Sequence, residues 1–147
     1  MNENLQDWMR PGKASHGGFL GKEETLEEVL KADDEAVRKL GLTHQQIADR
    51  IEYFIIAVQY PTNSGKVVDG NFNVTGISCR GWQDCPWGDR IIQYGSMDFT
   101  VENLRTREKL SFPGLIVHLI RDHHFYEGKQ SPYRVDPEKA ARVLEIR

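Results

Sequence analysis

The chain has no long apolar run, only two cysteines and no excess of positive charge. No stretch approaches the roughly 20 continuous apolar residues that a membrane-spanning helix needs, so we expect no membrane partner. The net charge is −3 with histidine neutral. Because a general nucleic-acid coat needs surplus Lys and Arg to neutralise phosphates, nucleic acid is not an expected partner either.

A secretion signal is also missing from the start of the sequence. The residues MNENLQDWMRPGKASHGGFLGKEE contain no apolar core and no cleavage-like pattern. We therefore expect a cytoplasmic location, where thiols stay reduced. In that compartment the two cysteines are free or metal-bound rather than joined in a disulfide.

Length and composition are those of an ordinary folded domain. The chain has 147 residues, of which 39% are hydrophobic and 28% are charged. A chain of this size can bury a core without disulfides or metals. We predict an irregular lead-in over residues 1–21, followed by a single α+β domain over residues 22–147.

Helix signals dominate residues 22–60. Thr25 with Glu28 and Thr43 with Gln46 have the capping-box form, in which two side chains satisfy free backbone N–H groups at a helix start. Apolar residues follow each box at helical spacing, which predicts an N-terminal helical pair. The Asp33-Asp34 pair is expected to divide the first helix in two.

Residues 62–113 change to short runs of alternating apolar and polar residues separated by glycines, which is typical of strands. The runs around 97–101 and 110–112 predict an antiparallel hairpin, whereas PTNSGKVVDG is interpreted as a flexible turn. Helical spacing returns between Pro113 and Gly128, and Asp136-Pro137 has the form of a helix start. The fold class is therefore α+β, with an N-terminal helical pair, a central antiparallel sheet of three to five strands and two C-terminal helices.

Two cysteines and two histidines form the strongest candidate site. Cys79 and Cys85 are separated by five residues, and His118 and His123 by four. Thiolate and neutral imidazole are the ligands that tetrahedral zinc prefers. These four residues predict a structural zinc site of the Cys2His2 type in a small cytosolic interaction or regulatory protein. The alternative is a pair of free, buried thiols without a metal.

Helical geometry constrains the two histidines. At 100° per residue, His123 falls on the apolar face of its helix and His118 lies about 140° away. Both can reach one ion only if the helix tightens or ends between them. The alternative for His123 is a core histidine that bonds to backbone.

His118 and Asp122 lie one turn apart on a common helix face. A carboxylate at that spacing can share a metal with a histidine or orient it. This predicts, as a second hypothesis, a small metal-dependent hydrolase with His118, Asp122 and either His123 or His124 as ligands. Glu127 is then the candidate base, although no H-E-x-x-H signature is present. Whether the chain is an enzyme stays open.

Trp82 and Trp87 flank Cys85, and two interpretations remain open for them. Tryptophan is common at binding hot spots, so the pair predicts a protein partner at this region. The alternative is that both rings pack over a buried cysteine turn.

Residues 42–51, LTHQQIADRI, support a third hypothesis. The segment resembles the first helix of many helix-turn-helix domains, which often read L-T-x-x-x-I-A, and that resemblance implies a DNA-binding regulator. The next residues, EYFIIAVQYP, continue the helix where that family has a turn and a recognition helix.

Overall fold

The computed structural model describes residues 2–10, 18–58, 62–78, 84–90 and 97–147. Within these residues the chain forms five helices and four strands. The helices are α1 (Asn2–Trp8), α2 (Leu26–Lys39), α3 (His44–Ala57), α4 (Ile116–His123) and α5 (Pro137–Val143). The strands are β1 (Thr62–Val68), β2 (Phe72–Ser78), β3 (Met97–Asn103) and β4 (Lys109–Pro113).

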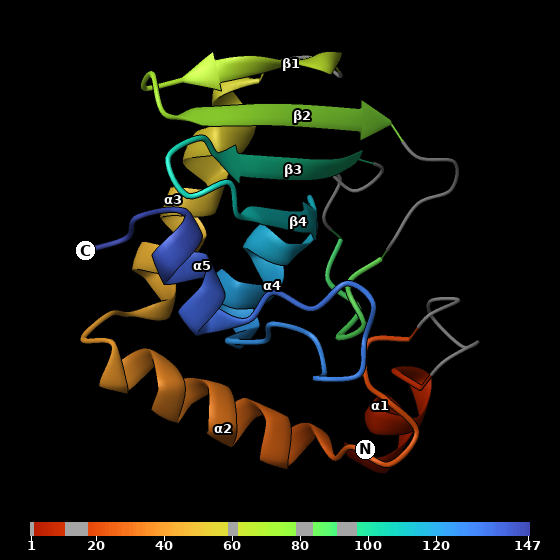
Figure 1. Ribbon diagram of the computed structural model, residues 1–147. Coiled ribbons are helices and arrows are strands. Elements are labelled where there is room, and N and C mark those ends of the chain that lie inside the picture. The colour runs from red at the N-terminus through yellow and green to blue at the C-terminus, as the bar shows by residue number, and fades with distance from the viewer. Residues whose placement is uncertain (1, 11–17, 59–61, 79–83, 91–96) are drawn as a thin grey trace.

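The four strands form one antiparallel sheet in the order β1-β2-β3-β4, so each strand pairs with its neighbour in the sequence. Val74 lies opposite Val101, which lies opposite Leu110, and all three side chains are buried on one face. Helix α3 packs against α4, and α5 contacts β4, while α2 lies far from β1 (Figure 1). The predicted α+β class, with helices before and after a central sheet, is confirmed.

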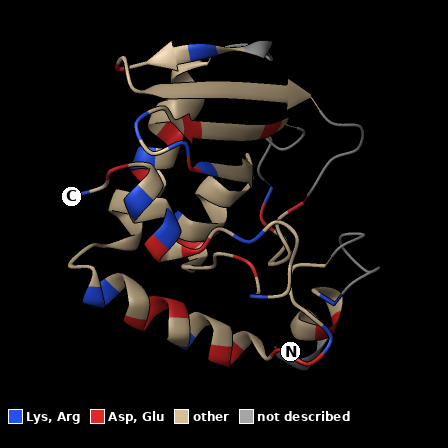
Figure 2. Cartoon of the chain, viewed as in Figure 1, with Lys and Arg blue, Asp and Glu red and all other residues tan. Residues whose placement is uncertain are grey.

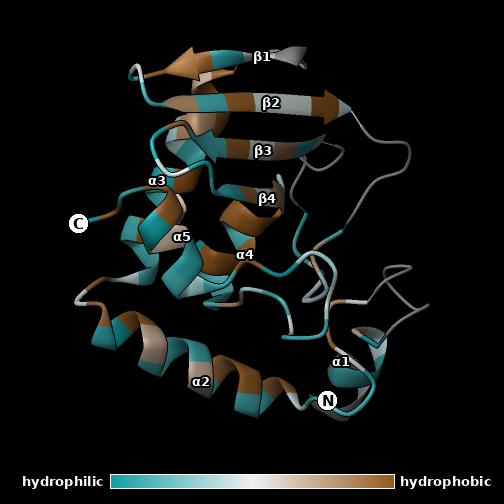
Figure 3. Cartoon of the chain, in the orientation of Figure 1, coloured by the Kyte–Doolittle hydropathy of each residue, from teal (hydrophilic) through white to brown (hydrophobic). Residues whose placement is uncertain are grey.

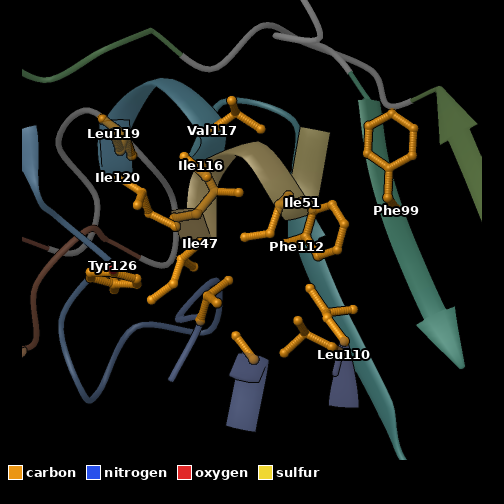
Figure 4. Packing of buried hydrophobic residues seen from close by; sticks show 14 of the residues in the cluster. Ile47, Ile51, Phe99, Leu110, Phe112, Ile116, Val117, Leu119, Ile120 and Tyr126 are labelled. Atoms are coloured by element: carbon orange, nitrogen blue, oxygen red, sulfur yellow. The ribbon is translucent and has the colours of Figure 1, made fainter. Parts of the chain in front are cut away.

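The core lies between the sheet and helices α3 and α4. Ile47 and Ile51 of α3 meet Ile116 and Ile120 of α4, and all four are fully buried (Figure 4). Burying an aliphatic side chain of this size stabilises a fold by about 1.5–3 kcal/mol. In Figure 3 the ribbon of α4 has prominent brown, hydrophobic segments, whereas teal and brown segments alternate along α2. Packing in the core therefore sets the position of α4, and this in turn sets the positions of the two histidines that α4 carries.

Helix starts agree with the predicted caps. The side chains of Thr25 and Asp136 accept hydrogen bonds from backbone N–H groups of the first helical turn. Thr43 and Gln46 form the complete capping box. Such caps satisfy backbone donors that have no partner inside the helix. They involve only a few consecutive residues, so they can be predicted from the sequence.

Four sequence-based expectations are wrong in detail. The predicted irregular lead-in contains helix α1, and PTNSGKVVDG is not a flexible turn because its residues 62–68 form strand β1. An Asp69-Gly70 turn with positive φ at both residues joins β1 to β2. Helix α4 is also shorter than expected, since it ends at His123.

The fourth correction concerns α2, which runs unbroken through Asp33 and Asp34. Each carboxylate has a cationic or imidazole partner, so neither needs to turn back onto its own backbone and interrupt the helix. Asp33 is buried and accepts two hydrogen bonds from Arg134, at 2.7 and 2.8 Å. Asp34 pairs with Arg38 and with His44.

Candidate metal centre

Helix α4 presents two histidines at one end of the core. His118 lies in its first turn, and His123 is the last helical residue. His124 then adopts a left-handed conformation with φ of 55°, and its N–H bonds to the carbonyls of Leu119 and Ile120. The rings of His118 and His123 lie 5.1 Å apart at an angle of 86°. Despite their angular separation on the helix, the two imidazoles therefore converge.

The segment 84–90 supplies the other half of the site and is drawn in green in Figure 1. Cys85 is 4% exposed, and its carbonyl accepts a 2.9 Å hydrogen bond from the N–H of Gly88. Gly88 has φ of 90°, a conformation that favours glycine. This tight turn carries Asp89 back toward the cysteine.

Burial raises the pKa of the Cys85 thiol, and the Asp89 carboxylate raises it further. Hydrogen bonds from the backbone N–H groups of Trp87 and Asp89 act in the opposite direction by stabilising the thiolate. On balance the pKa of Cys85 lies above its usual value because burial dominates, so the thiol is favoured unless a cation binds the sulfur.

Four potential ligand atoms of Cys85, Asp89, His118 and His123 lie within 4.8 Å of one another. Asp89 Oδ2 is 3.0 Å from His118 Nε2 and 2.7 Å from His123 Nε2. Cys85 Sγ is 3.7 Å from His123 Nε2 and 3.8 Å from Asp89 Oδ2. Around a tetrahedral zinc, with bonds of about 2.3 Å to sulfur and 2.0 Å to nitrogen, neighbouring ligand atoms lie about 3.3–3.5 Å apart. The two sulfur distances are slightly longer than these values, and the two Asp89–histidine distances are shorter, by about 0.6 Å for His123. The four atoms therefore cluster at roughly the spacing of zinc ligands, and small side-chain shifts would be needed for tetrahedral geometry.

Both ring nitrogens of His118 face a carboxylate. Its Nδ1 lies 2.7 Å from Asp122 Oδ2, and its Nε2 lies 3.0 Å from Asp89 Oδ2. A neutral imidazole has a single N–H and cannot donate to two carboxylates. A neutral His118 ring can therefore donate to one of these carboxylates only, which leaves its other nitrogen available as an acceptor or a metal ligand.

His123 is oriented by aromatic packing. Its ring is stacked on the indole of Trp87, with centroids 4.0 Å apart and an interplanar angle of 4°. Trp87 in turn meets Phe125 edge-on at 5.4 Å. Trp87 is half-buried, so a large part of its surface already has a partner within the fold.

Three of the four predicted zinc ligands, Cys85, His118 and His123, converge in the structure. Cys79 lies outside the described residues, so its place as a ligand stays a prediction. Asp89 is the member of this cluster that sequence reasoning missed. Its position four residues after Cys85, behind a glycine turn, was a usable signal, but one carboxylate among 22 acidic residues does not stand out.

The hydrolase hypothesis adds Asp122, His124 and Glu127 to the two histidines, and none of these three belongs to the cluster of four ligand atoms. Asp122 contacts His118 at Nδ1, on the side of the ring away from Asp89. His124 is exposed and stacks on His44 with centroids 4.2 Å apart. Glu127 is fully buried and hydrogen-bonded to Ser131.

The helix-turn-helix resemblance is not continued in the structure. Helix α3 runs to Ala57, and the next described element is strand β1 rather than a second helix. The basic residues Arg105 and Arg107 are paired with Glu145 and Glu102. Lys and Arg are interspersed with Asp and Glu on α2 and near the C-terminus (Figure 2).

Of the two tryptophans predicted to form a partner surface, the structure describes only Trp87. Trp82 lies outside the described residues. Trp87 lines a groove of about 800 Å³ together with Leu5, Leu26 and Leu30. No helix in the described part of the chain has the length and apolar character needed to cross a bilayer.

Comparison of the chain with protein-family models, with curated proteins and with solved structures finds no match in any of the three. Function therefore has to be inferred from the atoms that the fold brings together.

Proposed function

We propose that this protein binds one zinc ion through Cys85, Asp89, His118 and His123. The observation that carries the proposal is the convergence of one sulfur, two imidazole nitrogens and one carboxylate oxygen within 4.8 Å. Zinc suits this mixed donor set, because it has no strong geometric preference and accepts thiolate, imidazole and carboxylate ligands.

The ion would join two parts of the chain that are far apart in sequence. Cys85 and Asp89 belong to a short segment without regular secondary structure, and the histidines belong to α4. Structural zinc contributes an apparent binding free energy of about 10–16 kcal/mol, most of it available only to the folded chain. We therefore infer that zinc holds the segment 84–90 against α4.

A regulatory or interaction role in the cytoplasm, with a protein partner near Trp82 and Trp87, fits such a zinc-held surface and stays a prediction. The small hydrolase with His118, Asp122 and His123 as ligands also stays a prediction. The contact between Asp122 and Nδ1 favours Asp122 as a support for His118 over a role as ligand, because Nε2 is the atom that faces Asp89.

Metal analysis of the purified chain tests the proposal. We expect one zinc per chain, retained by Cys79→Ser and His124→Ala and lost by Cys85→Ser and His118→Ala. Each retained variant is a matched control, since Cys79 is the other cysteine and His124 adjoins a ligand without facing the site. A metal-free chain, or zinc that survives both Cys85→Ser and His118→Ala, would overturn the proposal.

Thiol titration adds a second readout. Zinc should protect Cys85 from a thiol reagent until a chelator is added, because a metal-bound thiolate is not free to react. If Cys79→Ser abolishes zinc binding while Asp89→Ala does not, the Cys2His2 set is correct and the assignment of Asp89 is wrong.

A further inference from the structure

The four candidate ligands differ in how firmly the fold holds them. Cys85 is 4% exposed, and its backbone is held by the 2.9 Å hydrogen bond from the Gly88 N–H to its carbonyl. The His118 side chain is 10% exposed and is held at Nδ1 by Asp122. The His123 side chain is 17% exposed and is stacked on Trp87. Each of these three therefore has a support that is independent of a metal.

Asp89 lacks such a support. Its side chain is 45% exposed, and within the part of the chain that the structure describes its carboxylate contacts only Cys85, His118 and His123. If this carboxylate rotated into solvent, it would lose only its contacts with Cys85, His118 and His123. Asp89 is also the most exposed of the four, since the side chains of His118 and His123 are 10% and 17% exposed and Cys85 is buried.

Resting on the proposed function, we propose that the position of Asp89 is an exchangeable coordination site, at which the bound zinc accepts an external monoanion. Cys85, His118 and His123 then form the permanent ligand set. Three protein ligands with a fourth, open position are the arrangement of reactive zinc sites, whereas structural zinc is enclosed by four permanent protein ligands.

The charge of the permanent set specifies the ligand. Zinc with one thiolate and two neutral imidazoles retains one net positive charge, and the Asp89 carboxylate neutralises it. A ligand that replaces Asp89 must carry one negative charge if the site is to stay neutral. The expected ligand is therefore a monoanion with a small donor atom. Hydroxide and carboxylate belong to this class, and azide is a convenient probe of it.

Absorption spectroscopy of the cobalt-substituted full-length chain tests the inference. Tetrahedral cobalt(II) has visible bands that depend on its ligands, and a cysteine ligand adds a thiolate-to-metal charge-transfer band. We expect azide to shift the visible bands of the wild-type chain in a saturable way while the charge-transfer band stays. In Asp89→Asn, cobalt should remain bound and azide should saturate at lower concentration, because a neutral amide competes less well for the metal.

Asp84→Asn is the matched control, since Asp84 is exposed, lies in the same segment and carries the same substitution. It should leave both the bands and the azide titration unchanged. Wild-type spectra that do not respond to azide, or loss of cobalt from Asp89→Asn, would overturn the exchangeable position while leaving zinc binding intact. If the wild-type chain takes up no cobalt, the proposed function fails as well.

Discussion

The imidazole of His123 lies flat on the indole of Trp87, with ring centroids 4.0 Å apart. The contact links a candidate metal ligand to the apolar packing around Phe125, because the edge of Phe125 meets the same indole. It restricts the rotation of His123 about its side-chain bonds, which reduces the entropy lost when the ring binds a metal. Trp87 is in this sense part of the candidate metal centre.

Replacing Trp87 should therefore weaken zinc binding without removing a ligand. We expect Trp87→Ala to lower zinc affinity by about tenfold, the lower end of the range for residues that support metal ligands. Trp87→Phe, which keeps an aromatic face for His123, should bind zinc more tightly than Trp87→Ala. Competition with a chromogenic chelator measures both affinities. Equal affinities for the two variants would show that stacking contributes nothing.

Asp122 should support His118 in the same way. Asp122→Ala removes the acceptor at Nδ1, which lies 2.7 Å from Asp122 Oδ2, and frees the ring to rotate. We expect zinc affinity to fall by about 10- to 100-fold. Asp84→Ala serves as the control, because Asp84 is exposed and is not among the ligand residues. Identical affinities in the two variants would contradict a positioning role for Asp122.

Glu127 should make stability depend on pH. Burial raises the pKa of Glu127 to about 8, and the hydrogen bond from Ser131 opposes this only in part. Among the described residues, Oε2 of Glu127 has no hydrogen-bond partner. The folded chain therefore keeps this proton up to a pH of about 8, whereas the unfolded chain loses it near the ordinary glutamate pKa of 4.5.

The sign follows from proton binding. Because the folded state binds more protons between these two pKa values, the free energy of unfolding falls as pH rises through the interval, by up to about 1.4 kcal/mol per pH unit. Urea unfolding at several pH values measures this slope. Glu127→Gln should flatten the part of the slope that Glu127 causes, and the exposed Glu138→Gln should not. Parallel curves for wild type and Glu127→Gln would refute the assignment.

The ion pair between Arg134 and Asp33 should be costly to break. Both side chains are almost fully buried, and the guanidinium donates two hydrogen bonds to the carboxylate. Arg134→Met leaves a buried, unpaired carboxylate, and we expect a loss of about 3–5 kcal/mol in the free energy of unfolding. The surface pair of Arg38 and Asp34 is the comparison, and Arg38→Met should cost less than about 1 kcal/mol. Denaturant titration decides between these values, and similar losses for the two variants would contradict the prediction.

Local chemistry made much of the fold predictable. Thr25, Thr43 and Asp136 cap the helices that their sequence contexts indicate, because a cap involves only a few consecutive residues. The β3–β4 hairpin was equally legible, since Phe99, Val101, Leu110 and Phe112 alternate with polar residues in both strands.

Strand β1 was missed for the opposite reason. Its sequence TNSGKVV contains few apolar residues. The strand lies at the edge of the sheet, where hydrogen bonds to β2 stabilise it more than burial of side chains does. Gly65 in this strand has φ of 84°, and a Cβ there would lie 2.5 Å from the side chain of Asn73. Neither the pairing nor the close approach can be read from the strand alone.

The sequence by itself determined the helix caps, the hairpin, the α+β class and the residue types suited to zinc, because each depends on chemistry or periodicity within a short segment. Only the tertiary structure decided that His118, His123 and Cys85 meet at one point, with Asp89 between them rather than Asp122. The physical reason is that core packing sets the position of α4 relative to the segment 84–90. The two parts are about 30 residues apart in the sequence, and no local sequence pattern determines how close they lie in space.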